Sequence, residues 1–231
     1  MAPVPPNVAV IAKNLKSEYN SLAGTDEVRM MQGLQSIIAL YFKKRNLRTA
    51  LHEIATIMHR LFPFRELSIG IKSPSDGLYR YVELIGLAPS AREEHLKLSY
   101  TYNQMFDQEA YPFVAISKYT AFRYAERDRG GEIVEKEAFS RPSLLSMPRK
   151  SPDEMLEGDY FDVYIFNYRD ELIGWIEVAQ PKDGIIPSMR TIRWLEMFAT
   201  IMAPYLDEEL ERMKLAEFGK TMAHPEHLNE R

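Results

Sequence analysis

Polar and aromatic residues alternate with apolar ones along several predicted strands, and they are the residues best placed to bind a small molecule. Alternate side chains of a strand lie on the same face of its sheet. We therefore expect one face to carry Ser68, Gly70, Tyr81, Glu83, Ser117, Tyr119, Asp162, Tyr164, Trp175 and Glu177. Aromatic rings mixed with a few polar groups are typical of a ligand pocket. The alternative is a face that meets solvent or a covering helix, as in many antiparallel sheets.

Glu177 is the most telling of these positions because it interrupts an apolar strand. A carboxylate buried there would need a partner. The region expected to cover this face contains Arg123, Arg127 and Arg141. One of these arginines could pair with Glu177, or could bind an anionic ligand in a bidentate manner. The alternative for each of them is a solvated position in a loop.

A dense group of aromatic residues lies between the second and fourth predicted strands. Tyrosine combines a flat apolar ring with a polar tip, so such a group can line a cavity for a planar ligand or fill a core between helix and sheet. The group comprises Tyr100, Tyr102, Phe106, Tyr111, Phe113, Tyr119, Phe122 and Tyr124.

Several kinds of catalytic and metal chemistry are disfavoured by the residues present. The chain has no cysteine, which removes disulfides, thiolate metal sites and cysteine nucleophiles. His52 and His59 are seven residues apart on a predicted helix, or about 10 Å along its axis, too far for one metal ion. His95 is expected at the surface. No phosphate-binding glycine loop or paired acid–base carboxylates are evident, so we expect no enzyme and no metal.

Composition places the chain among globular proteins with one main domain. It has 231 residues, of which 45% are hydrophobic and 27% charged. The net charge of −4 argues against nucleic acid as the main partner. No apolar run approaches the roughly 18 residues of a membrane span, and the first residues lack a signal-peptide pattern. We therefore expect a cytoplasmic protein that does not enter a membrane.

Hydrophobic periodicity predicts an α+β fold. Three helices are expected before residue 62, followed by strands at 67–71 and 79–87, a helix at 89–106 and a strand at 113–119. Residues 123–158 are expected to form a long loop with one short helix. Strands at 160–166 and 172–179 precede a final helix, 188–218, which Pro204 should bend. The two hairpins indicate an antiparallel sheet.

One ordered set of segments resembles the end of a GAF domain, a small-molecule sensor of prokaryotic signalling proteins. The set is Leu172-Ile173-Gly174-Trp175-Ile176-Glu177-Val178, then Pro181-Lys182-Asp183-Gly184, Pro187-Ser188 and Leu195-Glu196-Met197-Phe198-Ala199. The helix from Asn46 and the strand from Glu66 are similar to the family's beginning. Acidic residues often precede the turn proline in the family, whereas Ala179 and Gln180 stand here.

The resemblance implies a five- to six-stranded antiparallel sheet with N- and C-terminal helices on one face and a pocket on the other. It implies three parts: a disordered Pro-rich start with N-terminal helices at 1–45, the GAF-like domain at 46–205, and a helical extension with a polar tail at 206–231. Family ligands include cyclic nucleotides, tetrapyrroles, haem and nitrate, so no cofactor can be named. The expected ligand-binding residues are Tyr81, Glu83, Ser117, Tyr119, Arg123, Arg141, Tyr164, Trp175 and Glu177.

The terminal helices suggest how such a domain would signal. Apolar residues recur every three or four positions along the first helix and along the end of the last one, an imperfect coiled-coil pattern. We expect a homodimer built from these helices, acting through a signalling protein partner. The alternatives are a first pair of helices that folds back on its own domain, and a ligand-free GAF-like module that serves as a dimerising scaffold or adaptor.

Overall fold

The structure is a computed structural model that describes residues 7–43, 45–124 and 135–223. The Pro-rich start (1–6), the end of the polar tail (224–231) and Arg127 lie outside the described residues. The helices are α1 (Val8–Leu22), α2 (Asp26–Phe42), α3 (Leu47–Leu61), α4 (Pro89–His95), α5 (Tyr102–Met105) and α6 (Met189–Ala223), with short 3₁₀ turns η1 (Lys136–Ala138) and η2 (Pro142–Leu144). The strands are β1 (Phe64–Lys72), β2 (Tyr79–Ile85), β3 (Phe113–Ala115), β4 (Thr120–Arg123), β5 (Tyr160–Phe166) and β6 (Leu172–Pro181).

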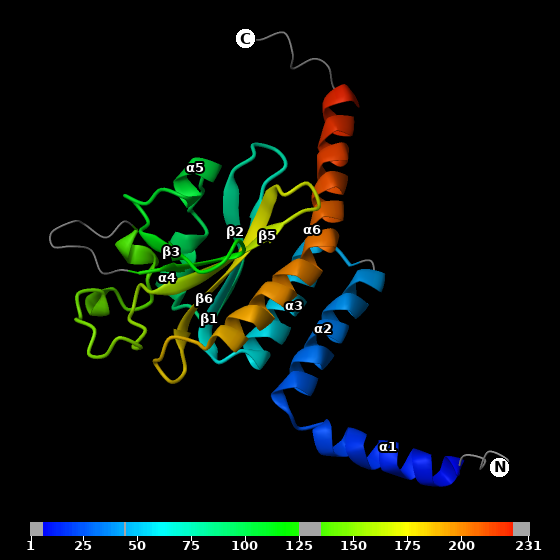
Figure 1. Cartoon of the computed structure of the whole chain (residues 1–231). Helices are drawn as coiled ribbons and strands as arrows, with labels where there is room; N and C mark the ends of the chain where they lie inside the picture. The colour runs from blue at the N-terminus through cyan, green and yellow to red at the C-terminus, as the bar shows by residue number, and fades with distance from the viewer. Residues whose placement is uncertain (1–6, 44, 125–134, 224–231) are drawn as a thin grey trace, which may run out of the picture.

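A single antiparallel sheet forms the centre of the molecule (Figure 1). Its six strands run in the order β2-β1-β6-β5-β4-β3, so the chain has the α+β architecture predicted from its sequence. Residues 113–123 form two short strands instead of the single predicted one, with a turn at 116–119 between them. The helix predicted at 89–106 is divided into α4 and α5, because a capping box at Thr101 and Gln104 starts a separate helix.

Helices α3 and α6 cover one face of the sheet, which we call the helix face, and α2 packs on these two helices (Figure 1). Asn46 caps α3 as predicted, since its side chain accepts a hydrogen bond from the Thr49 amide at 2.9 Å. The main apolar core lies between the helices and the sheet. Its largest fully buried members include Ile37, Ile54, Met58, Phe62, Phe64, Leu67, Ile69, Ile165, Ile176 and Phe198.

The first helix does not join this layer. No side chain of α1 is buried, and Figure 1 shows the helix extending away from the domain. Its apolar residues are exposed, including Leu15 at 60% and Tyr19 at 69%. The first two helices were expected either to form a dimer or to fold back on their own domain. Helix α2 does fold back and buries Leu34 and Ile37, whereas α1 does not.

The last helix bends part-way along its length, as Figure 1 shows. Pro204 lies inside it and cannot donate to the helical ladder. Beside the proline, the hydroxyl of Tyr41 on α2 donates to the Ile201 carbonyl at 3.0 Å and accepts from the Tyr205 amide. A side chain inserted into the ladder next to a proline is a recognised cause of a helix kink. The bend predicted from Pro204 is therefore present, with α2 attached at that point.

Candidate functional site

A small cavity lies on the face of the sheet opposite the helices, which we call the pocket face. Its volume is about 30 Å³, enough for one or two water-sized groups. Residues from β2, β4, β5 and β6 meet there with others from α5 and the loops next to it. The lining consists of Tyr81, Tyr100, Met105, Tyr111, Arg123, Tyr160, Asp162, Trp175 and Glu177.

The indole of Trp175 forms part of the cavity wall because β1 has a glycine beside it. Gly70 pairs with Trp175 across the two strands. A Cβ atom at position 70 would lie 2.0 Å from the indole ring, so no other residue fits there with the ring in place. Tyr81 packs edge-on against the same indole, with ring centroids 5.0 Å apart. Aromatic faces thus form one side of the cavity.

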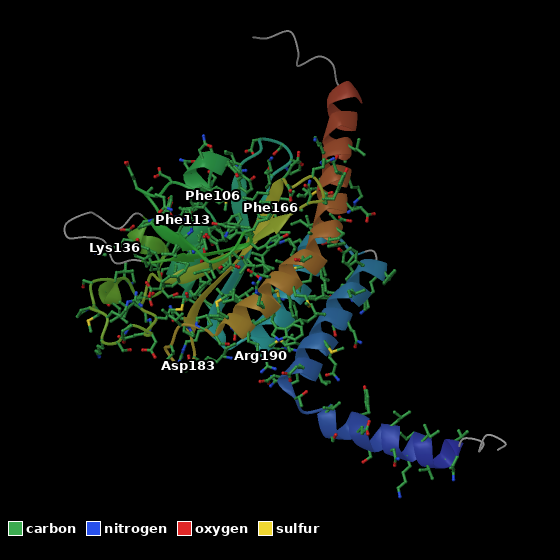
Figure 2. All side chains as sticks on the ribbon, viewed as in Figure 1. Phe106, Phe113, Lys136, Phe166, Asp183 and Arg190 are labelled. Atoms are coloured by element: carbon green, nitrogen blue, oxygen red, sulfur yellow. The ribbon has the colours of Figure 1, made fainter. Side chains whose placement is uncertain are left out.

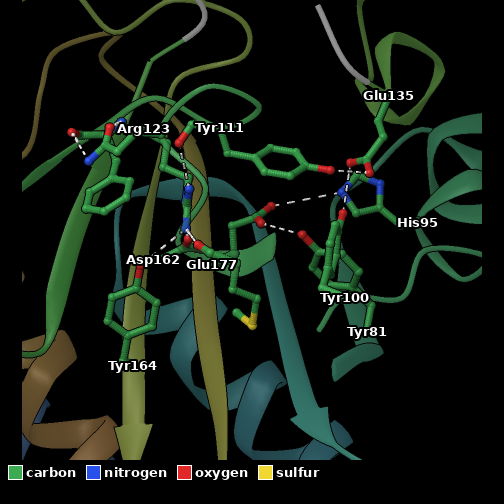
Figure 3. Close-up of polar contacts among 12 residues, drawn as sticks. Tyr81, His95, Tyr100, Tyr111, Arg123, Glu135, Asp162, Tyr164 and Glu177 are labelled. Atoms are coloured by element: carbon green, nitrogen blue, oxygen red, sulfur yellow. Dashed lines mark hydrogen bonds and ion pairs between the residues drawn. The ribbon is translucent and has the colours of Figure 1, made fainter. Parts of the chain in front are cut away.

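Arg123 is the buried cation of the site, and its hydrogen-bond donors are engaged by protein groups (Figure 3). Its Nε pairs with Asp162, and one terminal nitrogen donates to the Tyr111 carbonyl at 3.0 Å. The other donates to the Met105 carbonyl and to the Tyr164 hydroxyl. Four of the five guanidinium N–H groups are therefore in use. A bidentate grip on an anion would require breaking these contacts.

Asp162 faces the cavity with one oxygen satisfied and one not. Its Oδ2 receives the Arg123 Nε–H, whereas Oδ1 is buried without a hydrogen-bond partner among the described residues. Burial raises the pKa of Asp162, and the guanidinium of Arg123 opposes that rise. A buried acceptor without a donor is costly, so this oxygen is the point at which the site is incomplete.

Glu177 stands opposite Asp162 on the neighbouring strand. Its Oε2 accepts a hydrogen bond from the Tyr81 hydroxyl at 2.6 Å, and its Oε1 lies 4.0 Å from Nε2 of His95. Burial raises the pKa of Glu177 from 4.5 to about 8, and the nearby charge of Asp162 adds to the rise. Burial also lowers the pKa of His95. Near neutral pH, an empty site therefore favours a neutral glutamic acid beside a neutral histidine.

The carboxylate of Glu135 connects the segment just before η1 to the site. The two oxygens of Glu135 accept hydrogen bonds from the hydroxyls of Tyr100, at 2.8 Å, and Tyr111, at 2.6 Å. Glu135 has a φ of 58°, in the left-handed region, and directly precedes η1. Since both tyrosines line the cavity, movement of this segment would change the shape of the site.

The structure brings together four of the residues predicted to bind a ligand. Tyr81, Arg123, Trp175 and Glu177 line the cavity. Tyr164 does not line the cavity, but its hydroxyl accepts a hydrogen bond from a terminal nitrogen of Arg123 at 3.3 Å. Arg123 pairs with Asp162, which differs from the predicted pairing of an arginine with Glu177. Ligand binding by any of these residues stays a prediction.

Glu83 does not share the face of Tyr81, so the prediction of a common face was wrong. Tyr81 pairs with Gly70 and Glu83 with Ile69, so Val82 is an extra residue in a β-bulge. A bulge reverses the alternation beyond it. Glu83 consequently faces α3, where its Oε1 lies 3.2 Å from Nδ1 of His52.

Three other predicted residues also lie away from the cavity. Ser117 and Tyr119 belong to the turn between β3 and β4. Ser117 donates to Glu196 on α6, whereas Tyr119 packs against Phe166 beside a separate hollow of about 270 Å³ over Pro204. Arg141 pairs with Glu157 at 2.8 Å.

Other members of the site were not selected from the sequence. Asp162 was expected on the pocket face but was not named as a binding residue. Tyr160 lies two positions earlier on the same strand, so alternation places it on the same face. Tyr100 and Tyr111 belong to the aromatic group whose role was open. His95 was expected at the surface and is 8% exposed, because Tyr81 packs on its ring. No local sequence pattern points to Glu135, because its partners Tyr100 and Tyr111 are distant in the sequence.

Most of the solved structures that match this arrangement are described as GAF domains. The GAF domain of a phosphoenolpyruvate-protein phosphotransferase from Coxiella burnetii matches with a TM-score of 0.52 and 13% identity, over 84% of this chain and 99% of that one. The phycoerythrobilin-bound GAF domain of a cyanobacterial phytochrome matches with a TM-score of 0.50 and 13% identity, over 80% of this chain and 97% of that one. A GAF domain/HD domain protein from Geobacter sulfurreducens matches with a TM-score of 0.50 and 10% identity, over 71% of this chain and 94% of that one.

The chain therefore has a GAF-like fold, as its sequence resemblance implied, and identities this low establish the fold alone. No family model matches the sequence, and no curated protein does. Within residues 7–43, 45–124 and 135–223, no three histidine, aspartate or glutamate side chains are grouped to hold a metal ion. No helix in the same residues is long and apolar enough to cross a bilayer.

Proposed function

We propose that this chain is a non-catalytic regulatory domain that senses a small molecule in the pocket-face cavity. The observation that carries the proposal is the unsatisfied Oδ1 of Asp162, buried in a cavity lined by aromatic rings and ionisable groups. Proteins rarely leave a buried acceptor unpaired without a reason. The GAF-like fold supports the proposal, since a matching GAF domain is described as binding phycoerythrobilin.

Strand β6 provides a direct route from the cavity to the helices. Trp175 and Glu177 point to the cavity, whereas Ile176 is buried in the core on the helix face. The strand also lies close against α6: a Cβ atom at Gly174 would lie 3.1 Å from the Leu206 side chain. Densely packed interiors transmit small displacements. A ligand that moves Glu177 would therefore also displace the part of β6 that packs against α6.

The kink in α6 is the point where that movement would change direction. The part of α6 before Pro204 packs on the sheet, Leu206 and Leu210 after it are still buried in the core, and the rest of the helix extends past the domain (Figure 1). Tyr41 joins α2 to both sides of the proline through Ile201 and Tyr205. The Tyr205 hydroxyl in turn donates to the Arg45 carbonyl at 3.2 Å. We propose that α2 and the outer half of α6 move together as the output of the domain.

We propose further that the active form is a homodimer joined through the terminal helices. Helix α1 extends away from the domain with its side chains in solvent (Figure 2), and its apolar residues are exposed, including Leu15 and Tyr19. Leu215 on the outer half of α6 is 72% exposed. Light scattering after size exclusion tests this: Leu15→Glu should lower the measured mass to that of a monomer, and Lys16→Glu, next to it on the exposed helix, should not. A wild-type monomer at high concentration would contradict the dimer.

The second candidate is a ligand-free scaffold or adaptor with the same fold. The small cavity volume favours it, because the aromatic side chains themselves fill most of the pocket face. We propose no catalytic step, and the cytoplasmic location and a signalling partner stay predictions.

The thermal midpoint of the protein, measured against a panel of metabolites, separates the two candidates. The panel holds cyclic nucleotides, haem, tetrapyrroles, nitrate, aromatic acids and small amines. A ligand at 100 times its Kd adds about 2.7 kcal/mol to the free energy of unfolding. A saturable rise that disappears in Glu177→Ala supports sensing. A rise that persists in Glu177→Ala places binding elsewhere, and no rise with any compound favours the scaffold.

A further inference from the structure

Most of the donors around the cavity are already committed to protein acceptors. The hydroxyl of Tyr81 is bound to Glu177, and those of Tyr100 and Tyr111 are bound to Glu135. Arg123 uses four of its five N–H groups on Asp162, two carbonyls and Tyr164. Among the described residues, the buried side-chain atom left without a partner is an acceptor, Oδ1 of Asp162. A ligand that pairs with this oxygen must bring an N–H or O–H group.

A cation would also suit the charges around the cavity. Asp162 is compensated by Arg123, whereas no cationic side chain among the described residues contacts Glu177 other than His95, whose Nε2 lies 4.0 Å away. The Nδ1 of His95 lies 3.0 Å from the Ala91 carbonyl, which accepts only, so Nδ1 carries the proton and a neutral His95 turns a lone pair toward Glu177. Burial keeps Glu177 neutral in the empty site, and a cation bound beside it would favour its ionised form.

Aromatic faces and cavity size narrow the class of cation. Trp175 and Tyr81 line the cavity, and a cation placed over the face of such a ring is attracted by the ring quadrupole. A volume of about 30 Å³ admits one compact head group but no bulky ring. An alkylammonium group has three N–H donors and a single positive charge on a small head.

We propose that this cavity binds the protonated primary amine of a small molecule, held between the Asp162 and Glu177 carboxylates and the Trp175 ring. The inference rests on the proposed sensing function and names its ligand class. Amine binding completes the Asp162 shell and places a positive charge beside Glu177. Figure 3 shows the two carboxylates next to each other, with Arg123 on one side and Tyr81 and Tyr100 on the other.

Fluorescence of Trp175 tests the proposal directly. The chain has two tryptophans, so a Trp194→Phe background leaves Trp175 as the sole emitter. The probe is ethylamine hydrochloride at pH 8.5, where the amine is protonated, titrated at ionic strength held constant with KCl. A probe of three heavy atoms binds no tighter than about millimolar, so the titration runs to about 100 mM. We expect a saturable change in emission.

Matched variants separate the site from general electrostatics. Glu177→Gln keeps the shape of the side chain and an acceptor for Tyr81, and it should weaken ethylamine binding about 10-fold, the usual effect of losing one charge-assisted contact. Glu109→Gln removes an exposed carboxylate that does not line the cavity and should leave binding within about 2-fold. Asp162→Asn is a weaker test, because it removes the charge partner of buried Arg123.

Each other outcome overturns the inference in a distinguishable way. A response to sodium acetate or nitrate, with none to ethylamine, refutes the ammonium class and leaves sensing intact. An equal loss in Glu177→Gln and Glu109→Gln refutes this cavity as the site. Tetramethylammonium carries charge without N–H groups, so equal binding of that ion refutes the role of Asp162 Oδ1. If the folded protein responds to none of these probes, the amine proposal is refuted, and the metabolite panel decides the sensing function separately.

Discussion

The two faces of the sheet are built from the same six strands and differ in what they bury. The helix face packs apolar side chains from α2, α3 and α6 against Ile69, Ile176 and their neighbours. The pocket face buries Arg123, Asp162 and Glu177 among tyrosines and Trp175. Burial of apolar area stabilises a fold, whereas a buried ion pair gains little because desolvation offsets its attraction. The contrast indicates that the helix face supplies most of the apolar burial that holds the domain together, whereas recognition by the pocket face is our proposal.

The largest effect should follow a large-to-small change on the helix face. Phe198 is fully buried and packs edge-on against Phe62, with ring centroids 5.3 Å apart. Phe198→Ala should lower the free energy of unfolding by about 3–5 kcal/mol through lost burial and the cavity left behind. Denaturant unfolding measures the change. Met197→Ala, at an exposed position next to it, is the control and should cost under about 0.5 kcal/mol.

The next largest effect should come from dividing the ion pair on the pocket face. Arg123→Met leaves Asp162 charged and buried without its partner, and should cost about 3 kcal/mol. Replacing both residues, with Arg123→Met and Asp162→Leu, should cost less than the single change, because no buried charge remains. Unfolding in urea measures both variants. If the double variant is less stable than the single one, the pair contributes net stability and the contrast between the faces fails.

A smaller effect concerns pH and Glu177. Its pKa rises from 4.5 to about 8 on folding, so the folded chain binds more protons than the unfolded chain between these values. Stability from this group is therefore full below about pH 4.5, falls as pH rises and levels off above about pH 8. Glu66, with its pKa raised by burial to about 7, acts in the same direction.

Glu177→Gln should remove the contribution of Glu177 to this slope. Relative to wild type, the variant should gain about 2–3 kcal/mol between pH 6 and pH 8.5. Guanidinium unfolding at several pH values checks this, with the exposed Glu109→Gln as control. Parallel wild-type and Glu177→Gln curves would mean that Glu177 is ionised throughout this range, and the pocket face would then resemble an ordinary solvated surface.

The smallest effect should come from the hydroxyl at the helix kink. Tyr41→Phe keeps the ring contact with Tyr205 and removes the bridge between Ile201 and Tyr205. One such hydrogen bond contributes about 1 kcal/mol. Hydrogen exchange of the Tyr205 amide should accelerate, while exchange in β6 should not change. Unchanged exchange at Tyr205 would show that the proline alone sets the bend.

Local sequence patterns predicted much of the fold. The alternation of β1, β5 and β6, the N-cap at Asn46 and the bend at Pro204 all depend on residues close together in the chain, which is why they could be read directly. The turn that separates β3 from β4 carries no glycine–proline signal, so two strands were predicted as one. The bulge at Val82 is set by pairing with β1, and alternation alone placed Glu83 on the wrong face.

The sequence by itself determined the class of this protein: an antiparallel α+β sheet with apolar helices on one face and Tyr81, Trp175 and Glu177 on the other. Periodicity suffices for that because it decides which side chains must leave water. Only the tertiary structure decided that Arg123 pairs with Asp162 and that Asp162 Oδ1 is left without a donor. Those outcomes depend on distances between residues far apart in the chain, and burial makes them matter, because a buried polar group left unpaired cannot turn to water.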